Sequence, residues 1–306
     1  MKVAIIGGTG FVGSYLVDAL IDAGHEPHVL VRSGSEDKLH RAGECRLTTG
    51  DLGSPGAIDA VVAGCDAVIY NVGILREFPR QGITFEALQY RGAEDVAAAA
   101  KRAGVRRFLL MSANGIDSAS TPYQTTKLKA EAMIRESGLD YTIFRPSVIF
   151  GDPRGTMEFA TQLYRDMVRA PLPAVGFHTG LTPSHGDVLL SPVHVRDVAD
   201  AFVNALTDDS TIGKCYALGG PESVSWVEML ERIAAAVGKK KLILPMPIGF
   251  MKLGATLLDW LPVFPVTRDQ LTMLEDGNTA EPDDLAALIK REPKAFSPDN
   301  LGYLAG

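Results

Sequence analysis

Two residues spaced four positions apart in the chain could carry out acid–base chemistry on a carbonyl group. The stretch TPYQTTKLKAE, residues 121–131, contains Tyr123 and, four positions later, Lys127. In a helix this spacing puts the phenol and the ammonium on one face. The positive charge would favour the phenolate, so Tyr123 could exchange a proton with a carbonyl or alcohol oxygen. The pair can also arise by chance, with the lysine merely lying along a helix surface, so its role depends on the elements that position it.

A glycine-rich loop near the N-terminus predicts a binding site for a dinucleotide. The apolar run at 3–7 predicts a strand, and IIGGTGFVG leads from it into a predicted helix. The loop has the spacing Gly8-x-Gly10-x-x-Gly13, with Gly7 three positions before Gly10. Such glycines allow a pyrophosphate to approach backbone N–H groups at a helix N-terminus. The alternative is a glycine-rich turn with no ligand.

The residues after the second predicted strand favour NADP(H) over NAD(H). A protein that prefers NAD(H) places Asp or Glu there to bind the adenosine ribose. This chain has Arg32 and Ser33 in the stretch VLVRSGSEDK, and a guanidinium could hold a 2′-phosphate through two hydrogen bonds. The alternative is that Arg32 is solvated and that Glu36 or Asp37 reaches the ribose.

The alternation of elements up to about residue 150 predicts an α/β fold with a doubly wound parallel sheet. Short apolar runs rich in β-branched residues alternate with helical patterns that end on glycine. Strands that are apolar throughout indicate a parallel sheet covered on both faces. We expect a dinucleotide-binding domain over 1–150, joined by segments near 190–220, and a smaller, mainly helical lobe from 151–190 and 221–306. The strands are expected at 3–7, 27–32, 45–51, 66–73, 107–113 and 141–146.

Two sequence signatures predict helices in the C-terminal lobe. Ser225 with Glu228, and Thr267 with Gln270, have the spacing of capping boxes.

The stretch Pro245 to Val266 is apolar but is interrupted by charges and prolines, so it is too short to span a membrane. We expect it to form mostly a buried helix; the alternative is a surface helix that touches a membrane or an apolar partner.

Composition and charge exclude several classes of function. A net charge of −7 and a pI of about 5.4 disfavour nucleic acid as a partner. The three cysteines, Cys45, Cys65 and Cys215, and the six scattered histidines have no spacing typical of a metal site, so we predict no metal. The start MKVAIIGG predicts a strand rather than a signal peptide, which favours a cytoplasmic protein. The alternative is a protein bound peripherally to a membrane.

The motifs together resemble the short-chain dehydrogenase/reductase superfamily. The glycine loop is followed in order by GDL (50–52), NVG (71–73) and the Tyr-x-x-x-Lys pair. FRPSVIFG (144–151) and PVHVRDVADA (192–201) resemble its extended and atypical branch. AAAAKRAGVRRFLLMSANG and TRDQLTMLEDGN resemble the subgroup of the nucleotide-binding accessory subunit of respiratory complex I and its free-standing bacterial relatives. This resemblance implies a Rossmann fold in which a C-terminal lobe closes over the substrate.

The resemblance also implies roles for individual residues. The pyrophosphate would be held by Gly7, Thr9, Gly10, Phe11, Val12 and Gly13, and the adenosine ribose read by Arg32 and Ser33. The adenine would be flanked by Asp51 and Leu52, the middle of the cofactor lined by Asn71, Val72 and Gly73, and the carboxamide bordered by Pro146, Ser147 and Val148. Lys127 would bond the nicotinamide ribose, and Tyr123 would donate or accept the proton.

Two departures from the superfamily pattern favour cofactor binding over efficient turnover. The superfamily places a Ser or Thr after the fifth strand to bind the substrate oxygen; here this is Ser112, but another alignment puts Ala113 in its place. Gln89 stands where extended members often have Asn. Arg145 has two alternative roles, as an anchor of the sheet through a salt bridge or as a ligand of the bound molecule.

Two functions from different classes follow. The first is an NADP(H)-dependent oxidoreductase, or an epimerase-type relative, that acts on an unidentified small carbonyl or alcohol. The second is a non-catalytic, cofactor-bound structural or assembly protein with contacts to a respiratory complex. The oligomeric state stays open. A partly apolar substrate is suggested by the lobe residues Phe250, Leu253, Leu257, Leu258 and Trp260.

Overall fold

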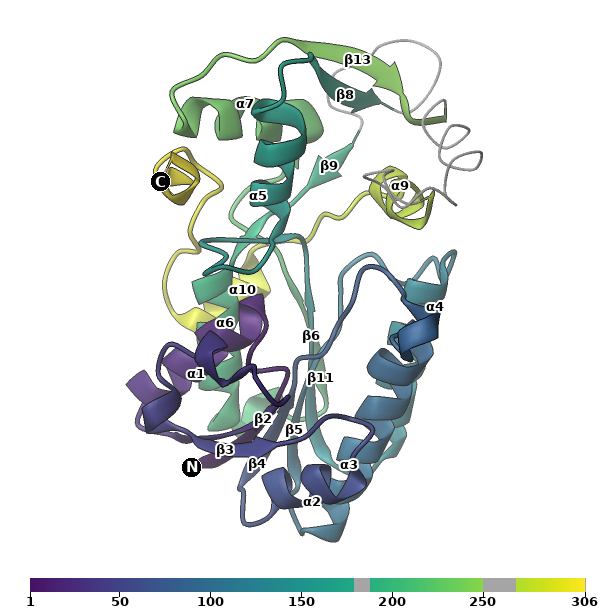
Figure 1. Ribbon diagram of the computed structural model, residues 1–306, viewed down its shortest axis with the longest axis vertical. Helices are drawn as coiled ribbons and strands as arrows, with labels where there is room; N and C mark the ends of the chain where they lie inside the picture. The colour runs from purple at the N-terminus through teal and green to yellow at the C-terminus, as the bar shows by residue number, and fades with distance from the viewer. Residues whose placement is uncertain (179–187, 250–267, 306) are drawn as a thin grey trace.

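Seven parallel strands form the central sheet of the protein, in the order β11-β6-β5-β4-β1-β2-β3 (Figure 1). The structure is a computed structural model and describes residues 1–178, 188–249 and 268–305. Every neighbouring pair in this sheet runs parallel, which confirms the predicted doubly wound fold. The strands are β1 Lys2–Ile6, β2 Glu26–Val31, β3 Arg46–Thr49, β4 Ala67–Tyr70, β5 Arg107–Met111, β6 Asp140–Pro146 and β11 Lys214–Leu218.

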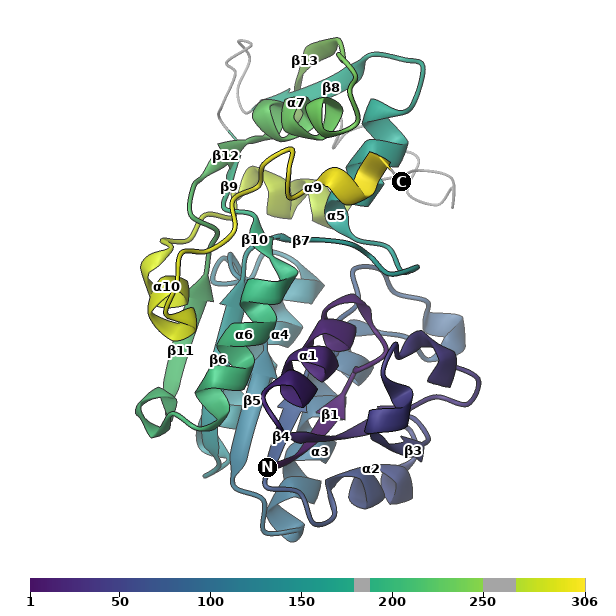
Figure 2. The same ribbon diagram turned by 90° about the vertical axis from the view of Figure 1, so that its left-hand side faces the viewer.

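Helices cover both faces of this sheet (Figures 1 and 2). One face carries α1 Phe11–Asp22, α6 Val195–Leu206 and α10 Asp283–Ile289. The other face carries α2 Pro55–Val62, α3 Gly92–Arg102 and α4 Pro122–Glu136. Each face has its own buried apolar cluster, and every residue of β4 and β5 is buried between them. Strands of this kind are stable only when both faces of the sheet are covered.

The chain returns to the sheet after leaving it at residue 150. α6 packs against α1, and β11 pairs with β6 to form one edge of the sheet. Between them, the buried guanidinium of Arg107 donates hydrogen bonds to the hydroxyls of Thr142 and Thr211 and to the Ala205 carbonyl, 2.5–2.8 Å away. These bonds satisfy a buried polar group and tie β5, β6 and the end of α6 together.

A smaller lobe stands above the carboxyl ends of the strands (Figure 1). Its elements are β7 Ile149–Phe150, α5 Phe159–Leu163, the π-helix η5 Tyr164–Val168, β8 Ala174–His178, β9 Leu189–Leu190, β10 Val193–His194, β12 Val224–Ser225, α7 Trp226–Ala236, β13 Ile243–Pro247, α9 Arg268–Glu275 and the short 3-10 helix η7 Gly302–Ala305. Its strands form three two-stranded pairs: β7 with β10 and β8 with β13 in parallel, and β9 with β12 antiparallel. The lobe core surrounds Trp226 and Phe150, and Ser225 forms the predicted capping box with Glu228, which is confirmed.

One sequence prediction in the lobe needs correction. The expected helix over 245–266 does not begin at Pro245, because residues 245–247 belong to strand β13, where they pair with β8. The rest of that stretch from Phe250 onward lies outside the described residues, as does Thr267 of the second predicted capping box. Among the described helices, none has both the length and the apolar character needed to cross a bilayer.

Candidate functional site

The predicted site residues lie along one edge of the sheet. In a parallel sheet the carboxyl ends of all strands meet at the same edge, and ligands bind in the crevice there. Each predicted residue lies at or just after the carboxyl end of a strand, in the first turn of α1, or on α4. Along the edge they come in the order Pro146, Ser147 and Val148 at the end of β6, Ser112 after β5, Asn71, Val72 and Gly73 after β4, residues 7–13 in the loop after β1 and the start of α1, Arg32 and Ser33 after β2, and Asp51 and Leu52 after β3.

The glycine loop has the shape that a pyrophosphate requires. Gly7 has a φ of +92°, and a Cβ there would lie 2.5 Å from the Asn71 carbonyl oxygen. A Cβ on Gly13 would overlap the Gly7 carbonyl group. α1 begins at Phe11 after Gly10, with no side chain capping its N-terminus. At Gly7 and Gly13 the loop therefore has no room for a side chain, and it leads into the uncapped N-terminus of α1, where the helix dipole favours an anion.

The residues predicted to read the adenosine half of the cofactor differ in how they are engaged. Arg32 and Ser33 are exposed immediately after β2, beside the glycine loop. The Asp51 carboxylate accepts hydrogen bonds from Gly53 N at 2.9 Å and from the Ser54 hydroxyl at 3.0 Å. Asp51 thus stabilises the turn that precedes α2. Arg32 begins a different turn, which is closed by a hydrogen bond from the Ser35 N–H to the Arg32 carbonyl oxygen. Of the four side chains, Arg32 is the one that carries a positive charge, and its role toward a cofactor stays a prediction.

Helix α4 starts at the position that its capping residues dictate. Thr121 and Gln124 form a capping box, and Pro122 occupies the first turn, where its missing N–H costs nothing. Tyr123 follows directly and is half-buried, with its ring edge-on to Phe85 at 5.7 Å between centroids. Burial raises the pKa of Tyr123 to about 12, so the side chain is a neutral phenol at neutral pH.

Lys127 lies one turn further along α4, with its ammonium buried against the ends of β4 and β5. Its Nζ donates hydrogen bonds to the Met111 carbonyl oxygen at 2.9 Å and to the Val72 carbonyl oxygen at 3.4 Å. Burial lowers the pKa of Lys127 to about 8, while the charge of Glu131 acts in the opposite direction. The ammonium is therefore mostly protonated at pH 7 and lies beside the loop that would line the middle of the cofactor.

Glu131 continues the same helical face and is the buried countercharge of this region. Its carboxylate receives two hydrogen bonds from Arg145, at 2.7 and 2.8 Å, and only 3% of its side chain is exposed. Burial raises the pKa of Glu131, but the hydrogen bonds and the positive charge of Arg145, together with smaller effects of the neighbouring Ser112 and Arg135, outweigh it, and the pKa ends below its usual value. Arg145 also contacts the exposed Asp117 at 3.0 Å. Of its two alternative roles, the structure shows the salt bridge.

Ser112 is buried on the α4 side of the sheet. Its hydroxyl lies beside the Glu131 carboxylate but makes no hydrogen bond of acceptable geometry within the described part of the chain. Ala113, the other candidate for the substrate-binding position, is buried and follows it directly. A buried hydroxyl without a partner is free to turn toward a bound oxygen. Ser112 thus keeps the capacity that its predicted role requires.

The lobe reaches the site through a segment that we call the strap, residues 276–280. The Asn278 carbonyl oxygen accepts a hydrogen bond from the Ser147 hydroxyl at 2.7 Å, and Asn114 donates to Asn278 Oδ1 at 2.9 Å. The Asp276 carboxylate accepts from the hydroxyls of Ser118 and Ser120, which precede α4. The strap therefore connects the loops after β5 and β6 to the lobe. Ser147 is predicted to border the carboxamide of the cofactor, but its hydroxyl donates a hydrogen bond within this connection.

Two of the residues that shape the site could be found from sequence only in part. Glu131 lies four positions after Lys127, so the helical period places it on the same face, but its burial and its pairing with Arg145 depend on tertiary packing. Gln89 is buried in the π-helix η4 (Glu86–Arg91), donates to the Ile74 carbonyl at 3.1 Å and accepts from the Thr126 hydroxyl at 2.9 Å. It fastens α4 to the loop after β4. No sequence signal identifies Asn278.

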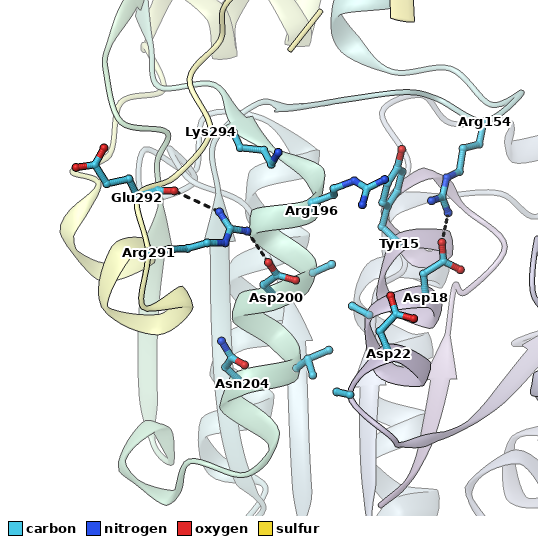
Figure 3. A pocket seen from close by; sticks show the side chains of 14 residues that line it. Tyr15, Asp18, Asp22, Arg154, Arg196, Asp200, Asn204, Arg291, Glu292 and Lys294 are labelled. Atoms are coloured by element: carbon cyan, nitrogen blue, oxygen red, sulfur yellow. Dashed lines mark hydrogen bonds and ion pairs between the residues drawn. The ribbon is translucent and has the colours of Figure 1, made fainter. Parts of the chain in front are cut away.

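A polar hollow of about 720 Å³ lies elsewhere, over α1 and α6, and not beside Tyr123 (Figure 3). It is on the sheet face opposite α4. Its walls carry both signs of charge, with Arg154 paired to Asp18 at 2.7 Å and Arg291 paired to Asp200. None of the predicted site residues lines this hollow, so we take the strand edge as the candidate site. The described residues contain no cluster of three or more metal-ligating side chains.

Comparison with known proteins places the chain among cofactor-binding proteins. Residues 7–168 match the family model described as NAD(P)H-binding. The chain belongs to this NAD(P)H-binding family. A ceramide reductase of Caulobacter vibrioides (strain NA1000 / CB15N) is 29% identical over 260 residues, which cover 84% of this chain and 78% of that protein. The mitochondrial NADH dehydrogenase (ubiquinone) 1 alpha subcomplex subunit 9 of Arabidopsis thaliana is 30% identical over 302 residues, which cover 92% and 70%.

Solved structures agree on the fold of this NAD(P)H-binding protein. The UDP-glucose 4-epimerase of Thermus thermophilus, in complex with NAD, superposes with a TM-score of 0.75 at 19% identity and covers 100% of this chain and 98% of that one. The predicted resemblance is confirmed: the relatives include reductases and complex I subunits, and the neighbours share the fold. The roles of the individual site residues stay predictions.

We expect Gly13→Ala to weaken dinucleotide binding. The new Cβ would overlap the Gly7 carbonyl and push the loop into the space of the pyrophosphate, and such overpacking costs about 1–3 kcal/mol of stability. Fluorescence titration with NADPH and with NADH, together with thermal unfolding, measures both effects. Gly43→Ala is the control, because a Cβ there meets nothing within 4 Å. Unchanged affinity for both dinucleotides in Gly13→Ala would place the pyrophosphate elsewhere.

Glu131→Gln should lower the pKa of Lys127 below its value of about 8, because the buried ammonium loses a carboxylate and faces Arg145 instead. The neutral amine then predominates at a lower pH. A titration of the labelled lysine Cε by NMR in the cofactor-free protein measures the change. Asp117→Asn removes the exposed partner of Arg145 and should leave the titration where it is. Identical curves for Glu131→Gln and wild type would contradict the coupling.

Proposed function

We propose that the protein is an NADP(H)-dependent oxidoreductase that interconverts a carbonyl and an alcohol on a small, partly apolar molecule. The observation that carries this proposal is the buried ammonium of Lys127, held by the Met111 and Val72 carbonyls one helical turn from Tyr123. Burying a charge is costly, and a surface lysine would do equally well for a purely structural helix. A buried ammonium beside the ends of the strands is suited to lowering the pKa of a nearby phenol through its positive charge.

The cofactor-binding residues support this chemistry. The loop at Gly7 and Gly13, which has no room for a side chain at either position, suits the pyrophosphate, and the Lys127 ammonium has one donor left for a ribose hydroxyl. When bound, the nicotinamide supplies or accepts a hydride at the substrate carbon. What the chain itself contributes is binding, orientation and the transfer of one proton at the substrate oxygen.

Tyr123 would carry that proton. In the direction of reduction, the neutral phenol donates it to the oxygen of the carbonyl as the carbon receives the hydride, and the product is the alcohol. The positive charge of Lys127, one helical turn away, would stabilise the phenolate that remains and so act against the burial that raises the pKa of Tyr123. The Ser112 hydroxyl, buried and without a well-formed hydrogen bond in the described chain, would polarise the same oxygen as a single donor.

The nature of the substrate is supported by a relative and by the lobe. The ceramide reductase is named for a molecule with long apolar chains. The lobe that would close over a substrate is built on an apolar core that includes Trp226 and Phe150. A small carbonyl compound with an apolar portion, such as a lipid-like ketone or a quinone, fits both observations.

A second function is supported by a different relative. The Arabidopsis thaliana protein is named as a subunit of NADH dehydrogenase, so a related role would be a cofactor-bound structural or assembly protein. One observation favours it: the hydroxyl of Ser147 is used to hold the strap through Asn278, so part of the predicted cofactor-facing loop serves the architecture. In this case Tyr123 and Lys127 would hold a cofactor without turnover.

Tyr123→Phe separates the two functions. For an oxidoreductase, removal of the proton donor should lower kcat by about 10²- to 10⁴-fold, with little change in NADPH affinity. The measurement is NADPH oxidation with a panel of long-chain ketones and quinones, chosen after mass spectrometry of what co-purifies with the chain. Thr125→Val, on the same helix but outside the pair, is the control for helix integrity.

A bound dinucleotide that exchanges slowly and that no carbonyl compound oxidises would contradict the enzyme and support the binding protein. Turnover that survives Tyr123→Phe unchanged would leave an oxidoreductase but remove Tyr123 as its proton donor. The two failures are distinct because the first concerns the wild-type chain.

Arg32→Asp tests the choice of cofactor. The guanidinium would make charge-assisted hydrogen bonds to a 2′-phosphate, so its replacement should weaken NADPH binding by about 10- to 100-fold and leave NADH binding nearly unchanged. Arg46→Asp is the matched control, because Arg46 is the first residue of β3 and lies at the end of that strand away from the predicted cofactor site. Equal wild-type affinities for NADPH and NADH would overturn the preference and point to Glu36 or Asp37 at the ribose.

A further inference from the structure

Three exposed leucines lie together at the far end of the lobe. Leu172 and Leu242 are 73% and 64% exposed and are the two most exposed large apolar side chains in the described part of the chain, and Leu244 is 49% exposed. They belong to two segments that run side by side, because β8 and β13 are paired and Ala174 N donates to the Leu242 carbonyl at 2.9 Å. In Figure 1 this pair of strands lies at the end of the lobe away from the sheet.

The alternation of a strand explains why these leucines project outward. Successive side chains in a strand point to opposite faces. Ile243 packs against the lobe core, and Lys241 donates a hydrogen bond to the Ala170 carbonyl. Leu242 and Leu244, on the other parity, face solvent. Neither the strand pairing nor the core of the lobe requires leucine at these positions, so their exposure is a feature to be explained.

Basic side chains surround the leucines in a chain that is acidic overall. Lys239 and Lys240 are exposed shortly before Leu242, and Arg169 is exposed three residues before Leu172. On the neighbouring described segments the acidic groups are Asp166, which is paired with Arg165 at 2.7 Å, and the exposed Glu228 and Glu231 on α7. Among the described residues, this end of the lobe therefore carries more basic than acidic side chains, in a chain with a net charge of −7.

We infer that this surface docks onto a bilayer that contains anionic phospholipids. The surface, which we call the leucine–lysine edge, consists of Arg169, Leu172, Lys239, Lys240, Leu242 and Leu244. Its leucines would enter the boundary between headgroups and acyl chains, while the lysines and the arginine keep their charged ends at the surface and pair with lipid phosphates. Protruding apolar side chains within a basic rim match that interface in both polarity and charge.

The same features argue against a second copy of the chain as the occupant. A two-fold interface brings a patch against itself, so the basic groups of one edge would face those of the other. Like charges brought together in this way oppose association. A bilayer with anionic lipids instead supplies the complementary charge and an apolar phase at the same depth. The inference is independent of the proposed function, because it concerns no residue of the cofactor site.

Co-sedimentation of the full chain with lipid vesicles tests the inference. We expect binding to vesicles of equimolar phosphatidylcholine and phosphatidylglycerol and much weaker binding to phosphatidylcholine alone. Salt at about 1 M, which screens charges beyond about 3 Å, should release most of the protein. The double variant Lys239→Glu/Lys240→Glu should lower the partition coefficient at least about tenfold. Leu242→Ser/Leu244→Ser should also lower it by about tenfold or more.

The matched control is Lys38→Glu/Leu75→Ser, which changes one exposed lysine and one exposed leucine of the sheet domain. It should bind the vesicles as the wild type does, and circular dichroism and NADPH titration verify that all variants are folded. Absence of wild-type binding to the anionic vesicles overturns the inference, as does an equal loss in the control. If light scattering shows a dimer that Leu242→Ser/Leu244→Ser breaks, the edge is a contact between copies, and the inference is also overturned.

Discussion

Parallel pairing of all seven strands is the constraint on which the rest of the structure depends. Because every strand runs in the same direction, the chain must return from the carboxyl end of one strand to the amino end of the next, and a helix is a compact way to make this connection. The same pairing brings the carboxyl ends of the strands to one edge, where loops separated by more than a hundred residues meet. The glycine loop, the exposed Arg32 and the Lys127 ammonium share a site for this reason.

Burial of charge is the second constraint and explains the arrangement around α4. The Lys127 ammonium could not remain protonated against β4 and β5 without carbonyl acceptors and a nearby carboxylate. Glu131 in turn requires the two hydrogen bonds from Arg145. Helix α4 and strand β6 are therefore held together by electrostatics at the point where Tyr123 is presented. The residues that hold the fold here also set the protonation of the candidate site.

The lobe is coupled to this edge by polar contacts rather than by a continuous apolar core. The lobe has its own apolar cluster around Trp226 and Phe150, separate from the two clusters of the sheet domain. The strap crosses between them and bonds to the loops after β5 and β6 through Asn278 and Asp276. Hydrogen bonds of this kind are exchanged with water more easily than apolar contacts.

The sequence by itself determined the sheet, its order of elements and the edge at which ligands bind. Apolar runs of strand length, glycine stops and the loop through Gly13 are local signals, and local signals survive without knowledge of the fold. The pair of Tyr123 and Lys127 was visible in the same way, from the period of a helix. Only the tertiary structure decided which charges are buried and with what partners. In the tertiary structure Arg145 pairs with Glu131, and Ser112 lies on the α4 side of the sheet. The hydroxyl of Ser147 bonds to the strap, and residues 245–247 form a strand. The sequence could not show this, because burial and pairing depend on contacts between segments that are distant in the chain.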